Sequence, residues 1–227
     1  MKKRFWSRHP WLWRCTYGIL ALLFAGIIVL LYIAYVYMPP EDRTDTRAYL
    51  RWMEQQHFDG YVNAGNFRLH YLHEGNGEPV VLLPGGGGWI YDMRDMIAAL
   101  APHYSVYAID PPGDGYTTPL APNPDYNRIY TLDSIDQSLL AFMDTLHIKR
   151  AAFIGNSWGE RLIPQMKTPT LVIWGKQDNL LLPNLYLPRW HQLDSHAQIV
   201  EIDHAGHTVH DDQPEQVSQL LLNFLAA

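Results

Sequence analysis

The stretch from residue 155 to residue 175, GNSWGERLIPQMKTPTLVIWG, decides the fold class. Its first five residues match the pattern G-x-S-x-G, and they directly follow an apolar run, RAAFI, at residues 150–154. Its last eight residues, TPTLVIWG, form a second apolar run that ends in glycine. Short apolar runs bounded by turn residues are typical of strands buried on both faces. Further runs of this kind alternate with helical patterns, so we predict an α/β protein with a mostly parallel sheet and helices on both faces.

The N-terminal part has the composition of a membrane anchor. Residues 15–40 contain no charged residue and no histidine. A membrane-spanning helix needs about 20 consecutive apolar residues, which this stretch provides. A cleaved signal peptide would have an apolar core of only about 7–15 residues, followed by small residues. A buried core helix would have a polar face. We therefore predict one transmembrane helix before the α/β domain.

The flanking charges predict the orientation of this helix. Five basic residues and no acidic residue precede it, whereas all 23 acidic residues of the chain follow it. Basic flanks stay in the cytoplasm. We expect residues 1–14 to be a cytoplasmic flank of a single-pass membrane protein, with the remaining chain on the extracytoplasmic side. The acidic balance beyond position 40 disfavours nucleic acid as a partner, and the lipid bilayer is the expected partner of residues 15–40.

The chain beyond the anchor divides into a short linker and one domain. Residues 41–60 should be a juxtamembrane linker with a short helix, because residues 43–57 have an amphipathic pattern. Residues 61–227 should form the α/β domain. Within it, residues 67–75, FRLHYLHEG, alternate like a strand with one face in water. This pattern predicts that His70 and His73 face solvent.

Three polar residues follow apolar runs in the chain order Ser, Asp, His. Ser157 lies in the G-x-S-x-G pattern, Asp178 follows the run LVIWG, and His207 follows the run QIVEID. From about Tyr61 to the C-terminus, these stretches resemble the α/β-hydrolase fold family, especially its serine esterase and proline iminopeptidase-like branches. The resemblance implies that Ser157 is the nucleophile, His207 the general base and Asp178 the carboxylate that orients His207.

The resemblance also implies an oxyanion hole built from backbone N–H groups. One donor is the residue after the nucleophile, here Trp158, and the other lies in the glycine loop PGGGG, where Gly86 is the best match. The family often has histidine before the first glycine, where this chain has Pro84. Trp89 and Tyr91 either bind the substrate or pack the first helix of the domain.

Several of these residues have a structural alternative. Ser157 could be an ordinary turn serine, and Asp178 could cap the following helix, since aspartate is a good N-cap. Asp203 is a rival acid. A cluster near the C-terminus could suggest a metal site: His204, His207, His210, Asp211 and Asp212. Its three-residue spacing would need a helix, which Gly206 disfavours, so we expect no metal and no cofactor.

The link between the two apolar runs of the opening stretch is unusually short. Residues 160–168 include Pro164, whereas a parallel crossover needs about a dozen residues. Compared with the family, the chain lacks the helix and strand after the nucleophile, and the cap. We therefore expect a sheet truncated in the middle, in which the strand TLVIW lies beside the strand AAFI or across a gap from it.

These observations lead to one functional hypothesis and two alternatives. The first is a membrane-anchored serine hydrolase that cleaves a small-molecule ester or amide through an acyl-enzyme intermediate. The tryptophan after the nucleophile is also reminiscent of proline iminopeptidase-like aminopeptidases. The missing crossover instead favours a catalytically inactive, membrane-tethered remnant or binding module.

Overall fold

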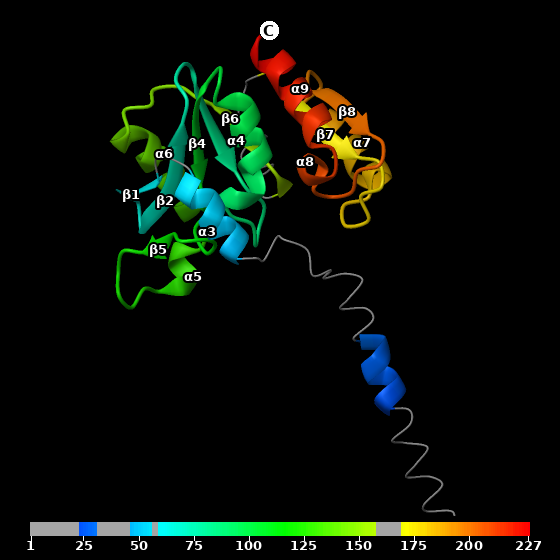
Figure 1. Cartoon of the computed structure of the whole chain (residues 1–227), viewed down its shortest axis with the longest axis horizontal. Helices are drawn as coiled ribbons and strands as arrows, with labels where there is room; N and C mark the ends of the chain where they lie inside the picture. The colour runs from blue at the N-terminus through cyan, green and yellow to red at the C-terminus, as the bar shows by residue number, and fades with distance from the viewer. Residues whose placement is uncertain (1–22, 31–45, 56–58, 158–168) are drawn as a thin grey trace, which may run out of the picture. The chain divides into compact units, whose positions relative to one another are not determined.

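The computed structural model of the chain describes residues 23–30, 46–55, 59–157 and 169–227 (Figure 1). The chain divides into two compact units, Met1–Tyr49 and Leu50–Ala227. In the first unit, residues 23–30 are helical and all are exposed. No helix among the described residues is both long and apolar enough to cross a membrane. The rest of the predicted anchor at residues 15–40, and the basic flank before it, lie outside the described residues.

The larger of two sheets in the second unit has the strand order β1-β2-β4-β3-β6, with the short β5 beside β2. Its strands are β1 (Asp59–Ala64), β2 (Phe67–Glu74), β3 (Pro79–Leu83), β4 (Ser105–Ile109), β5 (Thr118–Pro119) and β6 (Ala152–Gly155). β3 pairs in parallel with β4 and β6. β2 pairs antiparallel with β1, β4 and β5.

The prediction of a mostly parallel sheet is therefore wrong, because three of the five strand pairings in this sheet are antiparallel. The reason is the length of the connections. Only residues 65–66 separate β1 from β2, and only residues 75–78 separate β2 from β3. Connections this short reverse the chain, because a parallel crossover needs about a dozen residues. At the first turn, Gly65 has φ +58°, a conformation that glycine adopts without steric cost.

The second sheet contains only β7 (Leu171–Gly175) and β8 (Gln198–Ile202), which pair in parallel. Among the described strands, no ladder joins β6 to β7. Of the two arrangements that we expected, in which TLVIW lies beside AAFI or across a gap from it, the structure has the second. The link at residues 160–168 lies outside the described residues.

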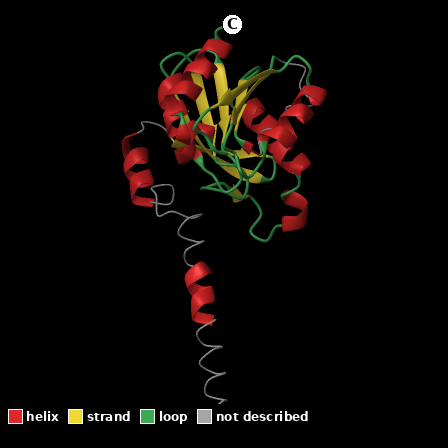
Figure 2. Ribbon diagram, turned by 90° about the vertical axis from the view of Figure 1, so that its right-hand side faces the viewer, coloured by secondary structure: helices red, strands yellow, loops and turns green. Residues whose placement is uncertain are grey.

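Helices cover both faces of the larger sheet, as predicted (Figure 2). α4 (Arg94–Leu100) and α9 (Pro214–Leu225) pack on one face, over a core cluster that includes Leu82, Val106 and Leu221. α6 (Leu132–Thr145) packs on the other face, over a cluster that includes Leu69 and Phe142. The remaining helices are α3 (Thr46–Gln55), η2 (Ile90–Met93), α5 (Tyr126–Ile129), α7 (Pro183–Leu193) and α8 (Val209–Asp212). α3 is the short helix that the amphipathic pattern predicted.

The prediction that β2 has a solvent face is wrong. Leu69 to Leu72 are all buried, and His70 is only 1% exposed. β2 lies between two other strands, and its alternate side chains enter different core clusters: Leu72 joins the cluster under α4, and Leu69 the cluster under α6. His73 is half-buried, with Nε2 2.8 Å from Ser105 Oγ. The alternating pattern failed because histidine occupied positions that the core covers.

Candidate active site

The turn after β6 has the backbone geometry that the G-x-S-x-G pattern predicts. Ser157 has φ +53°, in the left-handed region, which costs a residue other than glycine roughly 1–2 kcal/mol. The N–H of Asn156 donates to the carbonyl of Leu83 at 3.1 Å, which fixes the turn against the end of β3. A Cβ on Gly85 would lie 2.7 Å from Asn156 Oδ1 and 3.4 Å from Ser157 Cβ. The glycine loop therefore lies directly against the serine turn.

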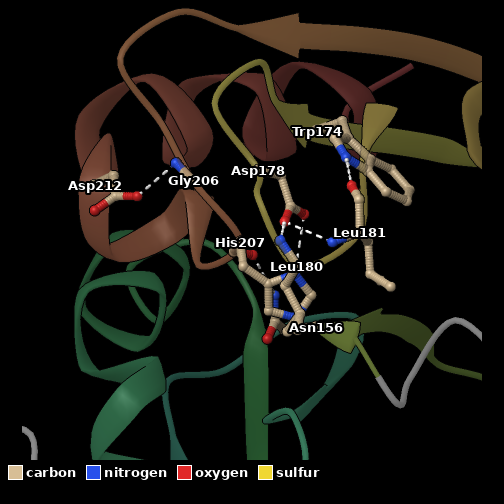
Figure 3. Close-up of polar contacts among 8 residues, drawn as sticks. All are labelled: Asn156, Trp174, Asp178, Leu180, Leu181, Gly206, His207 and Asp212. Atoms are coloured by element: carbon tan, nitrogen blue, oxygen red, sulfur yellow. Dashed lines mark hydrogen bonds and ion pairs between the residues drawn. The ribbon is translucent and has the colours of Figure 1, made fainter. Parts of the chain in front are cut away.

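Asp178 and His207 form a hydrogen-bonded pair at the ends of β7 and β8 (Figure 3). His207 Nδ1 lies 3.0 Å from Asp178 Oδ2, and Asp178 is 4% exposed. The other carboxylate oxygen, Oδ1, accepts hydrogen bonds from the N–H groups of Leu180 and Leu181, each at 2.8 Å. Asp178 thus holds the following turn and contacts His207. The alternative that Asp178 caps the following helix is wrong, because the N-cap of α7 is Leu182 and no side chain caps it.

The loops that carry this pair are fastened to each other. The N–H of Gln177 donates to the carbonyl of Ala205 at 2.9 Å, and the N–H of Ala205 donates to Gln177 Oε1 at 3.1 Å. A Cβ on Gly175 would lie 2.2 Å from the carbonyl oxygen of Gly206. Only glycine permits this approach of the two loops, which brings Asp178 within reach of His207.

One cavity of about 770 Å³ has Ser157, Asp178 and His207 among its lining residues. The Nδ2 of Asn156 donates to the carbonyl of His207 at 3.4 Å across it. Among the described residues, no hydrogen bond joins the Ser157 hydroxyl to the His207 ring. In structures without substrate, catalytic hydrogen bonds are often longer than in the reacting complex. The structure therefore brings the three residues to one cavity and bonds two of them.

The other candidate residues fall into three groups. Trp158 lies outside the described residues. Gly86 lies exposed in the loop next to the serine turn. Neither Trp89 nor Tyr91 lines the cavity. Tyr91 is buried, with its ring centroid 5.8 Å from that of Trp52, so its position favours a packing role.

The alternative residues have other contacts. Asp203, the rival acid, accepts from Lys176 Nζ at 2.9 Å near the surface. Asp212 accepts from the N–H of Gly206 at 2.7 Å (Figure 3). In the part of the chain that the structure describes, no group of histidine, cysteine or acidic side chains could hold a metal ion.

Sequence reasoning missed a buried polar cluster beside the glycine loop. His70 Nδ1 lies 2.8 Å from Asp110 Oδ2, and both side chains are at most 1% exposed. Near it, Asp114 accepts from the N–H of Gly87 at 3.1 Å. Burial raises the pKa of Asp114, the hydrogen bond from Gly87 lowers it, and the charge of Asp110 raises it further. The stretch DPPGDG after β4 was the available signal, since it places two carboxylates at the end of a buried strand.

Comparison with known proteins identifies the fold. A family model described as the alpha/beta hydrolase fold matches residues 78–159. The structure is similar to a carboxylesterase from Bacillus subtilis, with a TM-score of 0.69 and 16% identity over 79% of this chain and 96% of that one. It is also similar to a membrane phospholipase A, with a TM-score of 0.67 and 16% identity over 94% of this chain and 98% of that one. The chain is an α/β-hydrolase-fold protein.

Curated proteins with similar sequences are enzymes. A 2-hydroxy-6-oxo-6-(2'-aminophenyl)hexa-2,4-dienoic acid hydrolase of Metapseudomonas resinovorans is 34% identical over 110 residues, which cover 47% of this chain and 36% of the relative. A cis-3-alkyl-4-alkyloxetan-2-one decarboxylase of Shewanella oneidensis is 31% identical over 101 residues, covering 44% of this chain and 30% of the relative. The chain thus matches about a third of the length of these relatives, within the α/β-hydrolase fold.

Proposed function

We propose that this chain is a membrane-anchored serine hydrolase that cleaves a small-molecule ester or amide through an acyl-enzyme intermediate. One observation carries the proposal: the buried Asp178 carboxylate bonds His207 at 3.0 Å, in the same cavity as a serine on a left-handed turn. An ordinary turn serine does not need such a neighbourhood. A hydrogen-bonded carboxylate and imidazole beside a serine are the groups that acyl transfer requires.

The proposed reaction has two steps. Ser157 Oγ attacks the carbonyl carbon of the substrate while His207 Nε2 takes the hydroxyl proton, and Asp178 holds the opposite ring nitrogen. The bond to the leaving alcohol or amine then breaks, and the leaving group takes that proton from His207. In the second step, His207 takes a proton from water as the water oxygen attacks the acyl carbon. The bond from that carbon to Ser157 Oγ then breaks, His207 returns the proton to Oγ, and the acyl group leaves as the acid. The N–H groups of Gly86 and Trp158 are the expected donors to the negatively charged oxygen.

The exposed apolar helix at residues 23–30 supports the membrane anchor in this proposal. Six of its large side chains are between 52% and 67% exposed: Leu23, Phe24, Ile27, Ile28, Val29 and Leu30. An apolar surface of this kind favours a lipid environment. The similarity to the membrane phospholipase A covers 94% of the chain.

A fluorophosphonate probe, which reacts with activated serines, tests the catalytic part. The full chain in membranes should be labelled, and Ser157→Ala should lose the label. Ser195→Ala, at an exposed serine, is the matched control and should label like the wild type. Equal labelling of the wild type and Ser157→Ala contradicts the assignment of Ser157. Among active chains, comparison of simple esters with aminoacyl arylamides separates an esterase from an aminopeptidase.

A reporter fused after Ala227 tests the location. We expect the reporter to be active only outside the cytoplasm, with the protein recovered in the membrane fraction. A signal from the cytoplasm, or recovery of the full chain without membranes, contradicts the anchor.

In the part of the chain that the structure describes, no ladder joins β6 to β7, which favours the second candidate function, an inactive membrane-tethered remnant or binding module. In that case the wild type remains unlabelled although it unfolds cooperatively on heating.

A further inference from the structure

The backbone amides from Gly87 to Ile90, at the end of the glycine loop, all have acceptors within the protein. Residues 84–89 connect β3 to η2. Four successive N–H groups have acceptors: Gly87 donates to Asp114 Oδ2 (3.1 Å), Gly88 to the carbonyl of Gly85 (2.9 Å), Trp89 to Asp92 Oδ2 (3.0 Å) and Ile90 to Asp110 Oδ1 (2.8 Å). Among the described residues, the N–H of Gly86 has no acceptor. The loop therefore leaves free the amide that the resemblance assigns to the oxyanion hole.

Asp110 is the most buried of the three carboxylates that hold this loop. Its side chain is 0% exposed. Besides the N–H of Ile90, it accepts the N–H of Tyr116 at 2.8 Å and contacts His70 Nδ1 at 2.8 Å. A Cβ on Gly115 would lie 2.2 Å from the Asp110 carboxylate. A buried carboxylate needs such donors, because its desolvation is otherwise unfavourable.

His70 is itself fixed by the chain around it. Its N–H donates to Thr117 Oγ1 at 3.0 Å, and its carbonyl accepts the N–H of Asp110 at 3.0 Å. The Thr117 hydroxyl donates to the carbonyl of Asp110 at 2.7 Å. These bonds hold the backbone of His70 beside Asp110, and from there the buried ring contacts the Asp110 carboxylate.

The loop that Asp110 holds is the one that lies against the serine turn. The site of a Cβ on Gly85 is 3.4 Å from Ser157 Cβ, and Gly86 is the next residue. Stabilisation of an oxyanion depends on donors that are held in place before the reaction. A shift of the loop at Ile90 would move the Gly86 amide relative to Ser157.

We propose that His70 and Asp110 are positioning residues for the oxyanion hole: the buried pair holds the glycine loop so that the Gly86 amide remains available beside Ser157. The proposal rests on the proposed function, since it concerns the same reaction. Neither side chain touches the substrate. Their effect should therefore fall on the transition state more than on substrate binding.

The test compares His70→Leu with His70→Asn, because the asparagine amide can replace the donor that leucine lacks. Ser134→Ala is the matched control. It removes the acceptor of a partly buried side-chain hydrogen bond, from Asn66 Nδ2 at 2.9 Å, on the face of the sheet that α6 covers. The readouts are kcat and KM for a nitrophenyl ester, inhibition by a trifluoromethyl ketone that mimics the tetrahedral intermediate, and the thermal midpoint.

We expect His70→Leu to lower kcat and ketone affinity about tenfold or more, which is less than the 10²–10³-fold loss from deleting an oxyanion donor outright. KM should change little, and His70→Asn should recover much of the loss. Ser134→Ala should lower the thermal midpoint but leave kcat unchanged. A normal kcat in His70→Leu, or a kcat loss in Ser134→Ala as large as that in His70→Leu, overturns the proposal.

Two further measurements keep the proposal testable if a variant or the activity fails. If His70→Leu does not fold, Asp110→Asn, which has the same shape, takes its place with the same expected kcat loss. If the wild type shows no Ser157-dependent activity, the proposed function fails. The amide NMR signals of residues 85–90 then test whether His70 and Asp110 hold the glycine loop in place. His70→Leu must shift or broaden these signals while Ser134→Ala leaves them in place. Unchanged signals in His70→Leu overturn the proposal.

Discussion

The two halves of the candidate site are held in different ways. The half with Asp178 and His207 stands on two paired strands, whose following loops exchange hydrogen bonds through Gln177 and Ala205. The half with Ser157 stands on β6, which pairs only with β3 among the described strands. Between Ser157's turn and the His207 loop, the described contacts include one hydrogen bond, from Asn156 at 3.4 Å.

This difference shows which parts of a catalytic site are local in origin. Asp178 and His207 meet because two adjacent strands and their turns bring them together, so the pair needs nothing from the middle of the sheet. The distance between the base and the serine depends on packing across a gap. A chain without the middle of the sheet can therefore keep the contact between Asp178 and His207 while the distance between His207 and Ser157 varies. Four predictions test this comparison.

The largest effect should come from His207, the proposed general base. His207→Ala should lower the rate of ester hydrolysis or probe labelling by about 10³-fold or more, because no group would take the serine proton. The His207 side chain is 23% exposed, so the thermal midpoint should change little. His196→Ala, at an exposed histidine, is the control. A His207→Ala variant that retains a tenth of the wild-type rate would contradict the assignment.

The close approach of the two loops should be the next most sensitive feature. Gly175→Ala places a methyl group 2.2 Å from the Gly206 carbonyl, so the loops must separate. Overpacking of this kind typically costs about 1–3 kcal/mol of unfolding free energy. The activity should fall with the stability, because the Asp178–His207 contact spans these loops. Denaturant unfolding and ester hydrolysis measure the two effects.

Gly206→Ala is the matched control for this loop variant. A Cβ there would meet its nearest neighbour, Asp212 Oδ2, at 3.5 Å, an ordinary contact. Equal stability of Gly175→Ala and Gly206→Ala would show that the close approach is not needed for the pair.

The pH dependence of stability tests how Asp114 holds the glycine loop beside Ser157. Its raised pKa means that the ionised carboxylate is disfavoured in the folded state. The contribution of Asp114 to the stability of the wild type therefore falls as the pH rises through the ordinary carboxyl range, near 4. The loss of unfolding free energy is complete above the raised pKa. Asp114→Asn removes the charge but keeps an acceptor for Gly87, so it should be slightly more stable at pH 7. The thermal midpoints of the wild type and Asp114→Asn should differ at pH 7 and converge at pH 3, where Asp114 is protonated in both the folded and the unfolded wild type. A difference that is larger at pH 3 than at pH 7 contradicts the raised pKa of Asp114.

The smallest effect should come from the exposed ion pair beside Asp178 and His207. Lys176 and Asp203 form an ion pair at 2.9 Å with both side chains substantially exposed. Exposed pairs typically contribute about 0–1 kcal/mol. Lys176→Ala should leave the rate unchanged and lower the stability within that range, as measured by urea unfolding. A large loss of activity would instead favour Asp203 as the acid.

Local patterns in the sequence predicted the features that depend on a few adjacent residues. The serine turn, the order of the three polar clusters and the contact between Asp178 and His207 all follow from strands and the turns after them. The assignment of His70 to solvent failed because an alternating pattern does not reveal how many layers cover a strand. Asp110 was missed for a related reason: its partners come from β2, η2 and its own loop, which only the folded sheet brings together.

The gap between β6 and β7 also bears on how the domain opens. The two sheets share no backbone ladder among the described strands. The core cluster that spans both is made of side chains, from η2, α4, α8, α9, the strands and the loop after β8. Side-chain packing can loosen without breaking any ladder, so β7 and β8 can separate as a unit that keeps its own pairing. Amide hydrogens in β3 and β4 should then exchange with solvent only on global unfolding. Those in β7 and β8 should exchange together and earlier, and each such opening would carry Asp178 and His207 away from Ser157 at once.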